Sequence, residues 1–314
     1  MNDPGPAAEG RVFSDDELAA ISRSPWTAAL DALQRADLAA AAELVAQTEA
    51  NCRAQIVRYT GWLGSIAVAV ADRWGQAGGG MLATATRRFF ADSPDLAVAG
   101  SDDPPPIGGS AGWTGAGEAP EAVAQLERWI ERWRRTIDLH RDWISALLGA
   151  VYRTHGPDAL EEVLRVCGAQ GLMGSVEAFN QRDLRDRLVT FVSLLHGHFT
   201  ELVVTEDDRK FTITQDPCGT CTRQILDGRY GPPLDLPVVQ ERHRATWGRG
   251  ATTVYRSHVP IWHVEMARDH FGVPWPVNQC PAGLDGSPCR ILLFKDPYDP
   301  EANDLVPSGE RAGS

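Results

Sequence analysis

The chain has 314 residues, of which 43% are hydrophobic and 23% are charged, and its formal net charge is −12. That much apolar sequence can form one large core or two smaller ones. The negative charge argues against a nucleic-acid partner, because phosphate backbones are anionic as well. No cationic and apolar leader opens the chain, and its most apolar window, residues 62–71, is too short for a membrane helix. We therefore expect a cytoplasmic protein without a membrane partner.

The first part of the sequence predicts helices. Residues 1–13 are small, acidic and proline-containing, which predicts disorder, and Ser14 with Glu17 forms a capping box that begins a helix. From there to Phe90 the chain is rich in alanine and has few β-branched runs. The triplet Gly78–Gly80 predicts a helix end or a hinge. Apolar residues at steps of three and four predict one buried helix face, formed by Ile56, Tyr59, Leu63, Ile66 and Val70.

Residues 96–119 are rich in proline, glycine and serine and predict a flexible loop. A long helix is expected at 120–152 and a shorter one at 157–167, so that a helical region covers 14–180. Three arginines and the neighbouring acids, Asp138 and Asp142 among them, predict a solvated face on the long helix. Its apolar stripe, which predicts core packing, consists of Leu126, Trp129, Trp133, Ile137, Ile144 and Leu148.

The character of the sequence changes in residues 181–299. A helix at 183–198 precedes two short strand-like runs, which predict a β-hairpin at 201–214. A helix at about 258–271 and a last strand at 290–294 follow, and residues 300–314 predict a disordered tail. The expected fold class is therefore α+β, with a mostly helical N-terminal part followed by a small cysteine-rich α+β part that contains a β-hairpin.

Four of the six cysteines lie in this second part. Cys218 and Cys221 are separated by two residues, a spacing that lets both sulfurs reach one ion from a tight turn. Cys280 and Cys289 flank a loop that is rich in glycine and proline and able to bring its ends together. Because cytoplasmic cysteines are normally reduced and thiolates are soft donors, the pattern favours a Zn²⁺ site over disulfides.

Three other interpretations of these cysteines stay open. Cys218 and Cys221 have the spacing of a dithiol redox site, although the predicted hairpin before them and the glycines and prolines after them are untypical of one. The four cysteines are also enough to hold an iron–sulfur cluster, or they are ordinary buried residues. Cys52 and Cys167 stand alone on helical stretches, which indicates burial in the core.

The histidines supply further candidates. His198 continues the apolar stripe of the helix at 183–198, so it points inward, and His196 lies two residues before it. A lone inward histidine is more often a hydrogen-bonded core residue than a ligand. His258 and His263 lie on the helix predicted between Cys221 and Cys280.

Several short motifs between residues 180 and 297 resemble the L-2-amino-thiazoline-4-carboxylic acid hydrolase-like family. They are His196-Gly-His198-Phe, Glu-Asp-Asp before a Lys-Phe strand, Asp216-Pro-Cys218-Gly, Tyr255 with His258, and Pro288-Cys289 before a strand that ends Phe294-Lys-Asp-Pro297. The resemblance implies a helical N-terminal part, a small cysteine-rich α+β part and hydrolysis of a cyclic C–N bond.

The chain also departs from the family pattern. Relatives tend to carry further cysteines around the position of His258 and glycine where Cys221 stands, whereas Arg256 and Val259 lie beside His258 here. If the metal is retained, this departure implies that Cys221 replaces a lost ligand.

We therefore predict a zinc-dependent hydrolase that acts on a C–N bond of a small, cyclic or amino-acid-like molecule. The expected ligands are Cys218, Cys221, His258 and Cys289, with Cys280 as the alternative fourth ligand. A catalytic zinc keeps one position open for water and lowers the pKa of that water. His198 or His263 is then the expected general acid or base, because histidine titrates near neutral pH.

The alternative is a non-catalytic protein with a structural zinc, in which the tryptophan-rich helical part binds a small molecule or a partner. A closed shell of four protein ligands favours this alternative, and an open shell beside a cleft favours the enzyme. An exposed aromatic stripe on the helix at 120–152 would in addition favour a homodimer.

Overall fold

The fold is described from a computed structural model, for residues 10–93 and 119–306 of the chain. Most of the segments expected to be disordered or flexible, 1–13, 96–119 and 300–314, lie outside these residues. Where a segment expected to be disordered falls within the described residues, the expectation of disorder is wrong. Phe13 is buried against the sheet, and a short 3-10 helix, η5 (Pro300–Asn303), leads to the buried side chain of Val306. Apolar side chains dock both segments on the core.

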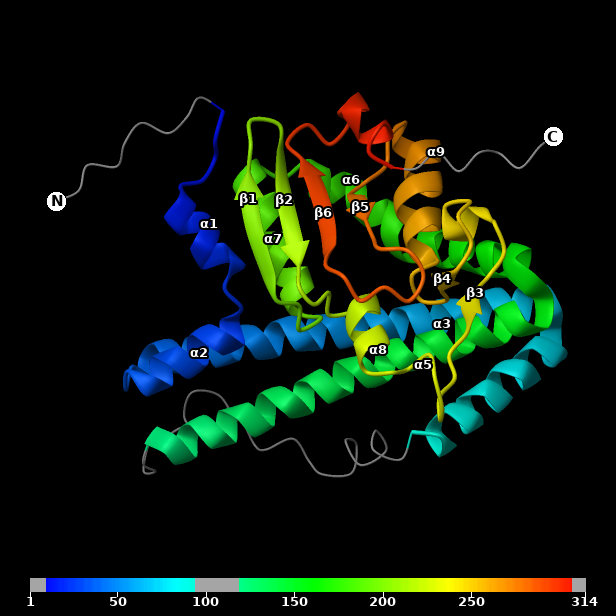
Figure 1. Cartoon of the computed structure of the whole chain (residues 1–314), viewed down its shortest axis with the longest axis horizontal. Helices are drawn as coiled ribbons and strands as arrows, with labels where there is room; N and C mark the ends of the chain where they lie inside the picture. The colour runs from blue at the N-terminus through cyan, green and yellow to red at the C-terminus, as the bar shows by residue number, and fades with distance from the viewer. Residues whose placement is uncertain (1–9, 94–118, 307–314) are drawn as a thin grey trace.

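The N-terminal part of the chain is helical, as predicted. Ser14 is the N-cap of the first helix, and the side chains of Ser14 and Glu17 form the predicted capping box. Two of the helices are far longer than the others and lie side by side (Figure 1). The helices of this part are α1 (Asp15–Ser22), α2 (Pro25–Gln34), α3 (Leu38–Ala91) and α5 (Ala119–Gly168).

Each long helix changes direction at a glycine with positive φ. The two helices expected at 120–152 and 157–167 are joined in α5 and separated by Gly156, at φ 83°. In α3 the break lies at Gly75, at φ 56°, and not at Gly78–Gly80 as predicted. Gly78 is helical and serves packing instead, because a Cβ there would lie 2.7 Å from Cγ1 of Val70.

The predicted apolar faces of α3 and α5 form the largest core. Ile66 and Val70 of α3 and Ile144 and Leu148 of α5 are completely buried and belong to one cluster. The aromatic stripe of α5 packs inside the chain as well, where Trp129 contacts α2 and the first turns of α3. The exposed stripe on which the homodimer prediction depended is therefore not present at Trp129, and the homodimer stays a prediction.

The α+β part contains one four-stranded antiparallel sheet with the order β1-β2-β6-β5. The predicted hairpin and last strand are confirmed, and β5 is an additional edge strand. Alternate residues of the hairpin are buried, such as Phe211 and Ile213, and they pack on the apolar face of α7. The elements are α7 (Leu184–His196), β1 (Leu202–Glu206), β2 (Lys210–Gln215), β5 (Val277–Gln279) and β6 (Cys289–Phe294).

Shorter elements connect the sheet to the long helices. The helix expected at 258–271 is present as a π-helix, η4, that continues into α9, and an additional short helix, α8, begins at Cys221. The end of β2 and the start of β6 both face the long helices, and α8 lies near these strand ends, on the side of the long helices (Figure 1). The remaining elements are η2 (Ala169–Met173), α6 (Gly174–Asn180), α8 (Cys221–Leu226), β3 (Val238–Val239), η3 (Arg244–Thr246), β4 (Thr252–Thr253), η4 (Val259–Met266) and α9 (Ala267–Phe271).

The part of the chain that the structure describes contains no helix that is both long and apolar enough to cross a membrane.

Candidate metal centre

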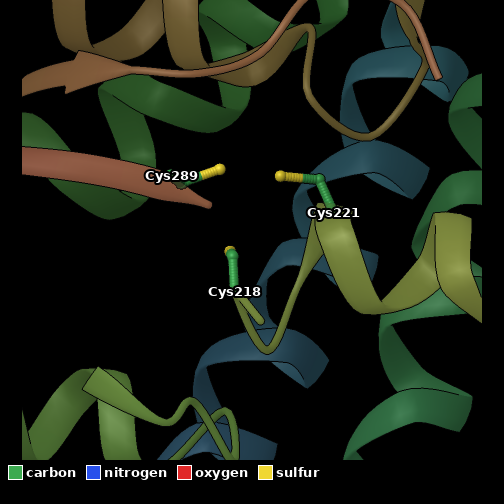
Figure 2. A group of neighbouring side chains, drawn as sticks. All are labelled: Cys218, Cys221 and Cys289. Carbon is green, nitrogen blue, oxygen red and sulfur yellow. The ribbon is translucent and has the colours of Figure 1, made fainter. Parts of the chain in front are cut away.

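Three cysteines from separate elements meet at the end of the sheet that faces the long helices. Cys218 lies in the turn after β2, Cys221 is the first residue of α8, and Cys289 is the first residue of β6. Their Sγ atoms all lie within 4.8 Å of one another, and all three residues are buried. Figure 2 shows the three sulfurs directed toward a common point between them.

This geometry fits a single metal ion. A tetrahedral ion with metal–sulfur bonds of about 2.3 Å separates its ligand sulfurs by about 4 Å. The three sulfurs lie within 4.8 Å of one another, close to that separation. Soft thiolates in this arrangement suit Zn²⁺ and similar ions, and three of them leave one tetrahedral position for another ligand.

Strand register and one glycine bring the cysteines together. Gln215 at the end of β2 pairs with Cys289, so Cys289 begins its strand beside the turn that holds Cys218. Gly219 then packs against the carbonyl oxygen of His198 at a distance that excludes any Cβ. Its N–H also donates to Oγ1 of Thr200 at 3.0 Å, which fixes the loop on the residues that follow α7.

A buried ion network holds the same loop from the side of α5. Arg141 pairs with Asp138 at 2.9 Å and with Asp142 at 2.8 Å, and its Nη1 donates to the carbonyl oxygens of Gly219 and Thr220. The predicted solvated face is therefore wrong for both aspartates, which are buried. They balance the charges of Arg141 on the same helix and of Arg223 on α8.

Arg223 of α8 completes this network. Its Nη2 lies 2.5 Å from Oδ1 of Asp138, and the guanidinium donates to the carbonyl oxygens of His198 at 2.9 Å and Phe199 at 2.8 Å. The network therefore joins α5, α8 and the end of α7 around the cysteine loop.

The three thiols do not ionise equally. Hydrogen bonds with Cys218 and Cys289, together with the positive charge of Arg256, hold the pKa of Cys221 well below its ordinary value. Hydrogen bonding to Cys221 and Cys289, with burial, raises the pKa of Cys218 well above its ordinary value. The hydrogen bonds among the three sulfurs and the charge of Arg256 therefore favour a thiolate within the cluster, which is the form of cysteine that binds metal.

The cysteines form one wall of a pocket of about 470 Å³. Leu195, Phe191, Phe179 and Trp275 contribute apolar surface to it. Arg58 and Arg182 are the cations among its lining residues in the described part of the chain, and no aspartate or glutamate is among them. A site with one polar, metal-binding wall and otherwise mostly apolar walls is typical of small-molecule pockets.

His258 lines this pocket but lies outside the group of three sulfurs. Its Nδ1 lies 2.6 Å from the carbonyl oxygen of Tyr255, so Nδ1–H donates and Nε2 keeps its lone pair. Metal-bound histidines usually have this arrangement. His258 therefore has the tautomer that a ligand needs, and its part in the metal site stays a prediction.

Cys280 also lines the pocket and is partly exposed. It lies near enough to Cys289 to form a hydrogen bond that helps to raise the pKa of Cys289. It is not one of the three sulfurs that converge, so it and His258 stay the two candidates from the chain for a fourth ligand.

The two predicted acid–base residues, His198 and His263, line the same pocket and are deeply enclosed. Burial lowers the pKa of each of them to about 3. Both rings are therefore neutral at neutral pH, so each can donate one hydrogen bond and accept another, and each is only a weak base there. Nδ1 of His263 lies 3.1 Å from the carbonyl oxygen of Trp275, which leaves Nε2 as the acceptor.

His198 is held by a short chain of hydroxyl groups. Tyr59 lies with its hydroxyl 2.8 Å from Nδ1 of His198, and the hydroxyl of Tyr255 donates to that of Tyr59 at 3.3 Å. When Tyr59 in turn donates to Nδ1, the proton of the neutral ring lies on Nε2. His198 then acts as a hydrogen-bond donor through Nε2, whereas His263 acts as an acceptor through Nε2.

Sequence reasoning missed the buried charges of this site. Arg256 has no exposed surface and acts electrostatically on Cys221, Cys280 and Cys289. Its position two residues before His258 was the signal in the sequence that could have identified it. Arg141 and Asp138 gave no signal, because their burial depends on Arg223 and on the cysteine loop, which are distant in the sequence.

Comparison with known proteins identified no relative: no family model, curated protein or solved structure matches the chain.

Proposed function

We propose that the protein is a zinc-dependent enzyme that hydrolyses a C–N bond of a small molecule. The observation that carries the proposal is that Cys218, Cys221 and Cys289 converge on one wall of the 470 Å³ pocket. A Zn²⁺ held by the three thiolates would supply a polarised water or carbonyl next to the bound molecule. Short motifs that resemble the L-2-amino-thiazoline-4-carboxylic acid hydrolase-like family support hydrolysis of a C–N bond as the reaction.

The residues of the pocket have separate roles in this proposal. Phe179 and Trp275 are in edge-to-face contact, with ring centroids 5.4 Å apart, and bind the apolar body of the substrate while they exclude water. Nε2 of His263 would accept a hydrogen bond from the attacking water and orient it, because Nδ1 faces a backbone carbonyl. His198 orients the substrate through the proton on its Nε2.

The rival function is a binding protein with a structural zinc. The observation that favours it is the closeness of Cys280 to Cys289, which would allow a closed shell of four thiolates. A third function, thiol redox chemistry between Cys218 and Cys221, predicts that these two oxidise reversibly and that no metal co-purifies.

The test uses the full chain loaded with zinc and a panel of cyclic amidines and amides of amino-acid size, 2-amino-thiazoline-4-carboxylate included. Ring opening is followed by NMR in the unaltered chain, in Cys218→Ala and in Cys52→Ala. Cys52 is the matched control, since it is a buried cysteine of α3 that lies outside the group of three sulfurs.

We expect turnover of at least one compound by the unaltered chain and by Cys52→Ala, and none by Cys218→Ala. Turnover that persists in Cys218→Ala contradicts the metal-dependent reaction. A zinc-loaded chain that binds members of the panel without hydrolysing them supports the binding protein instead.

A further inference from the structure

Arg256 is a buried cation beside the cysteine centre whose hydrogen-bonding capacity is only half used. It follows β4, and its exposed fraction is 0%. Its Nη1 donates to the carbonyl oxygens of Pro281 at 2.6 Å and Gly283 at 3.2 Å. Its Nε and Nη2 are completely buried and donate to no oxygen or nitrogen among the described residues, and the side chain that interacts with the guanidinium is the thiol of Cys221.

The negative groups that the guanidinium faces are thiol sulfurs and not carboxylates. Its strongest electrostatic partner is Cys221, followed by Cys280 and Cys289. Within the described ranges, 10–93 and 119–306, it forms no ion pair with a carboxylate. Asp285 feels its charge, but this carboxylate is exposed and accepts its hydrogen bonds from Ser287.

A buried guanidinium without a carboxylate partner lowers the stability of the folded protein. Removing a guanidinium from water is unfavourable unless a negative charge and hydrogen-bond acceptors replace the water. The buried guanidinium therefore needs a negative charge beside it, and the three converging sulfurs are the groups that can carry that charge. Thiolates at Cys218, Cys221 and Cys289 would supply the missing negative charge.

The charges of the assembled centre can then be compared for two kinds of shell. Three thiolates, one guanidinium and a divalent ion have no net charge. A fourth thiolate from Cys280 would leave one uncompensated negative charge in a buried site, whereas water or the neutral ring of His258 would leave none. Burial favours the neutral assembly.

We infer that Arg256 is the counter-ion of the cysteine centre and that it selects a divalent ion bound by three thiolates and one neutral ligand. The inference rests on the metal site of the proposed function and deepens it. It makes Arg256 a positioning residue, which acts on the ion through the thiolates, and it places Cys280 outside the shell.

The test measures Co²⁺, a spectroscopic substitute for Zn²⁺, in the full chain and in two variants. Arg256→Gln removes the charge and keeps donors for the carbonyl oxygens of Pro281 and Gly283, and Arg256→Lys keeps the charge. Affinity is measured by competition with a chelator, and circular dichroism confirms that each variant is folded. We expect Arg256→Gln to bind Co²⁺ about 10- to 100-fold more weakly, the range found when partners of metal ligands are removed. Arg256→Lys should recover most of that loss.

An affinity of folded Arg256→Gln within twofold of the unaltered chain overturns the inference while the metal site itself survives. Absence of Co²⁺ binding by the unaltered chain overturns the metal site and the inference together. The number of thiolates gives a measurement that does not need a variant of Arg256. The intensity of thiolate-to-Co²⁺ charge transfer should correspond to three thiolates and should be the same in Cys280→Ser. A decrease in Cys280→Ser shows a fourth thiolate and overturns the inference.

Discussion

Gly219 lies against the carbonyl oxygen of His198, closer than a residue with a side chain can approach. The contact seats the turn between Cys218 and Cys221 on the end of α7, so one backbone position links two sulfurs of the candidate centre to a histidine of the pocket. The sequence requirement here is steric, since the position has no side chain that could take part in chemistry.

Gly219→Ala should therefore weaken the centre without touching a ligand. A Cβ at this position meets the backbone of His198 and the side chains of Thr200 and Arg223, so the loop must move. We expect a loss of about 1–3 kcal/mol in the free energy of unfolding, typical of overpacking, and weaker zinc binding. Gly64→Ala is the control, because a Cβ there meets nothing within 4 Å. Equal zinc affinity in the two variants would show that the contact is unimportant.

The buried ion network makes a second prediction. Asp138→Asn removes the negative charge shared by Arg141 and Arg223 and should lower the free energy of unfolding by about 3–5 kcal/mol, since the buried Arg223 loses its carboxylate partner and the buried Arg141 keeps only Asp142 close to it. Glu131→Gln is the matched control. It breaks partly exposed pairs with Arg134 and Arg135 and should cost less than about 1 kcal/mol. Urea denaturation of both variants measures the difference, and similar losses would contradict a structural role for the network.

The third prediction concerns His196, which is buried at the end of α7 with its ring edge-to-face on Trp26. Burial lowers its pKa from 6.5 to about 4. As the pH falls below 6.5 the unfolded chain takes up a proton at this residue that the folded chain refuses, so stability is present above pH 6.5 and is lost toward pH 4. The slope is at most about 1.4 kcal/mol per pH unit.

His196→Gln should remove that contribution. Urea denaturation at intervals between pH 7.5 and 4 should give a smaller pH dependence in His196→Gln than in the unaltered chain. His270→Gln, a change at an exposed histidine, should leave the dependence as it was. If the slopes of all three proteins coincide, His196 is not a buried neutral histidine.

Local patterns in the sequence predicted the architecture well. The capping box of Ser14, the apolar faces of the long helices and the alternation of the hairpin each follow from neighbouring residues, and each is present. The bend of α3 was misplaced, because packing of Gly78 on Val70 cannot be distinguished in a sequence from a glycine that ends a helix.

The candidate site was predictable as far as it depends on spacing. Cys218 and Cys221 follow from their two-residue separation, and Cys289 joins them through the register of β2 and β6. The charges around them were not predictable. Arg256 pairs with sulfurs from other elements, and the burial of Asp138 depends on an arginine of α8, so both require the tertiary fold.

The metal content of the purified chain tests the central claim most directly. Elemental analysis should find about one zinc for each unaltered chain and each Cys167→Ala control, and close to none after Cys218→Ala or Cys289→Ala, with all four proteins folded by circular dichroism. Cys167 is a suitable control because it is buried in the helical core and is not one of the three converging sulfurs. A folded, unaltered chain that binds no zinc even after incubation with the ion, or a Cys218→Ala chain that retains it fully, would contradict the account.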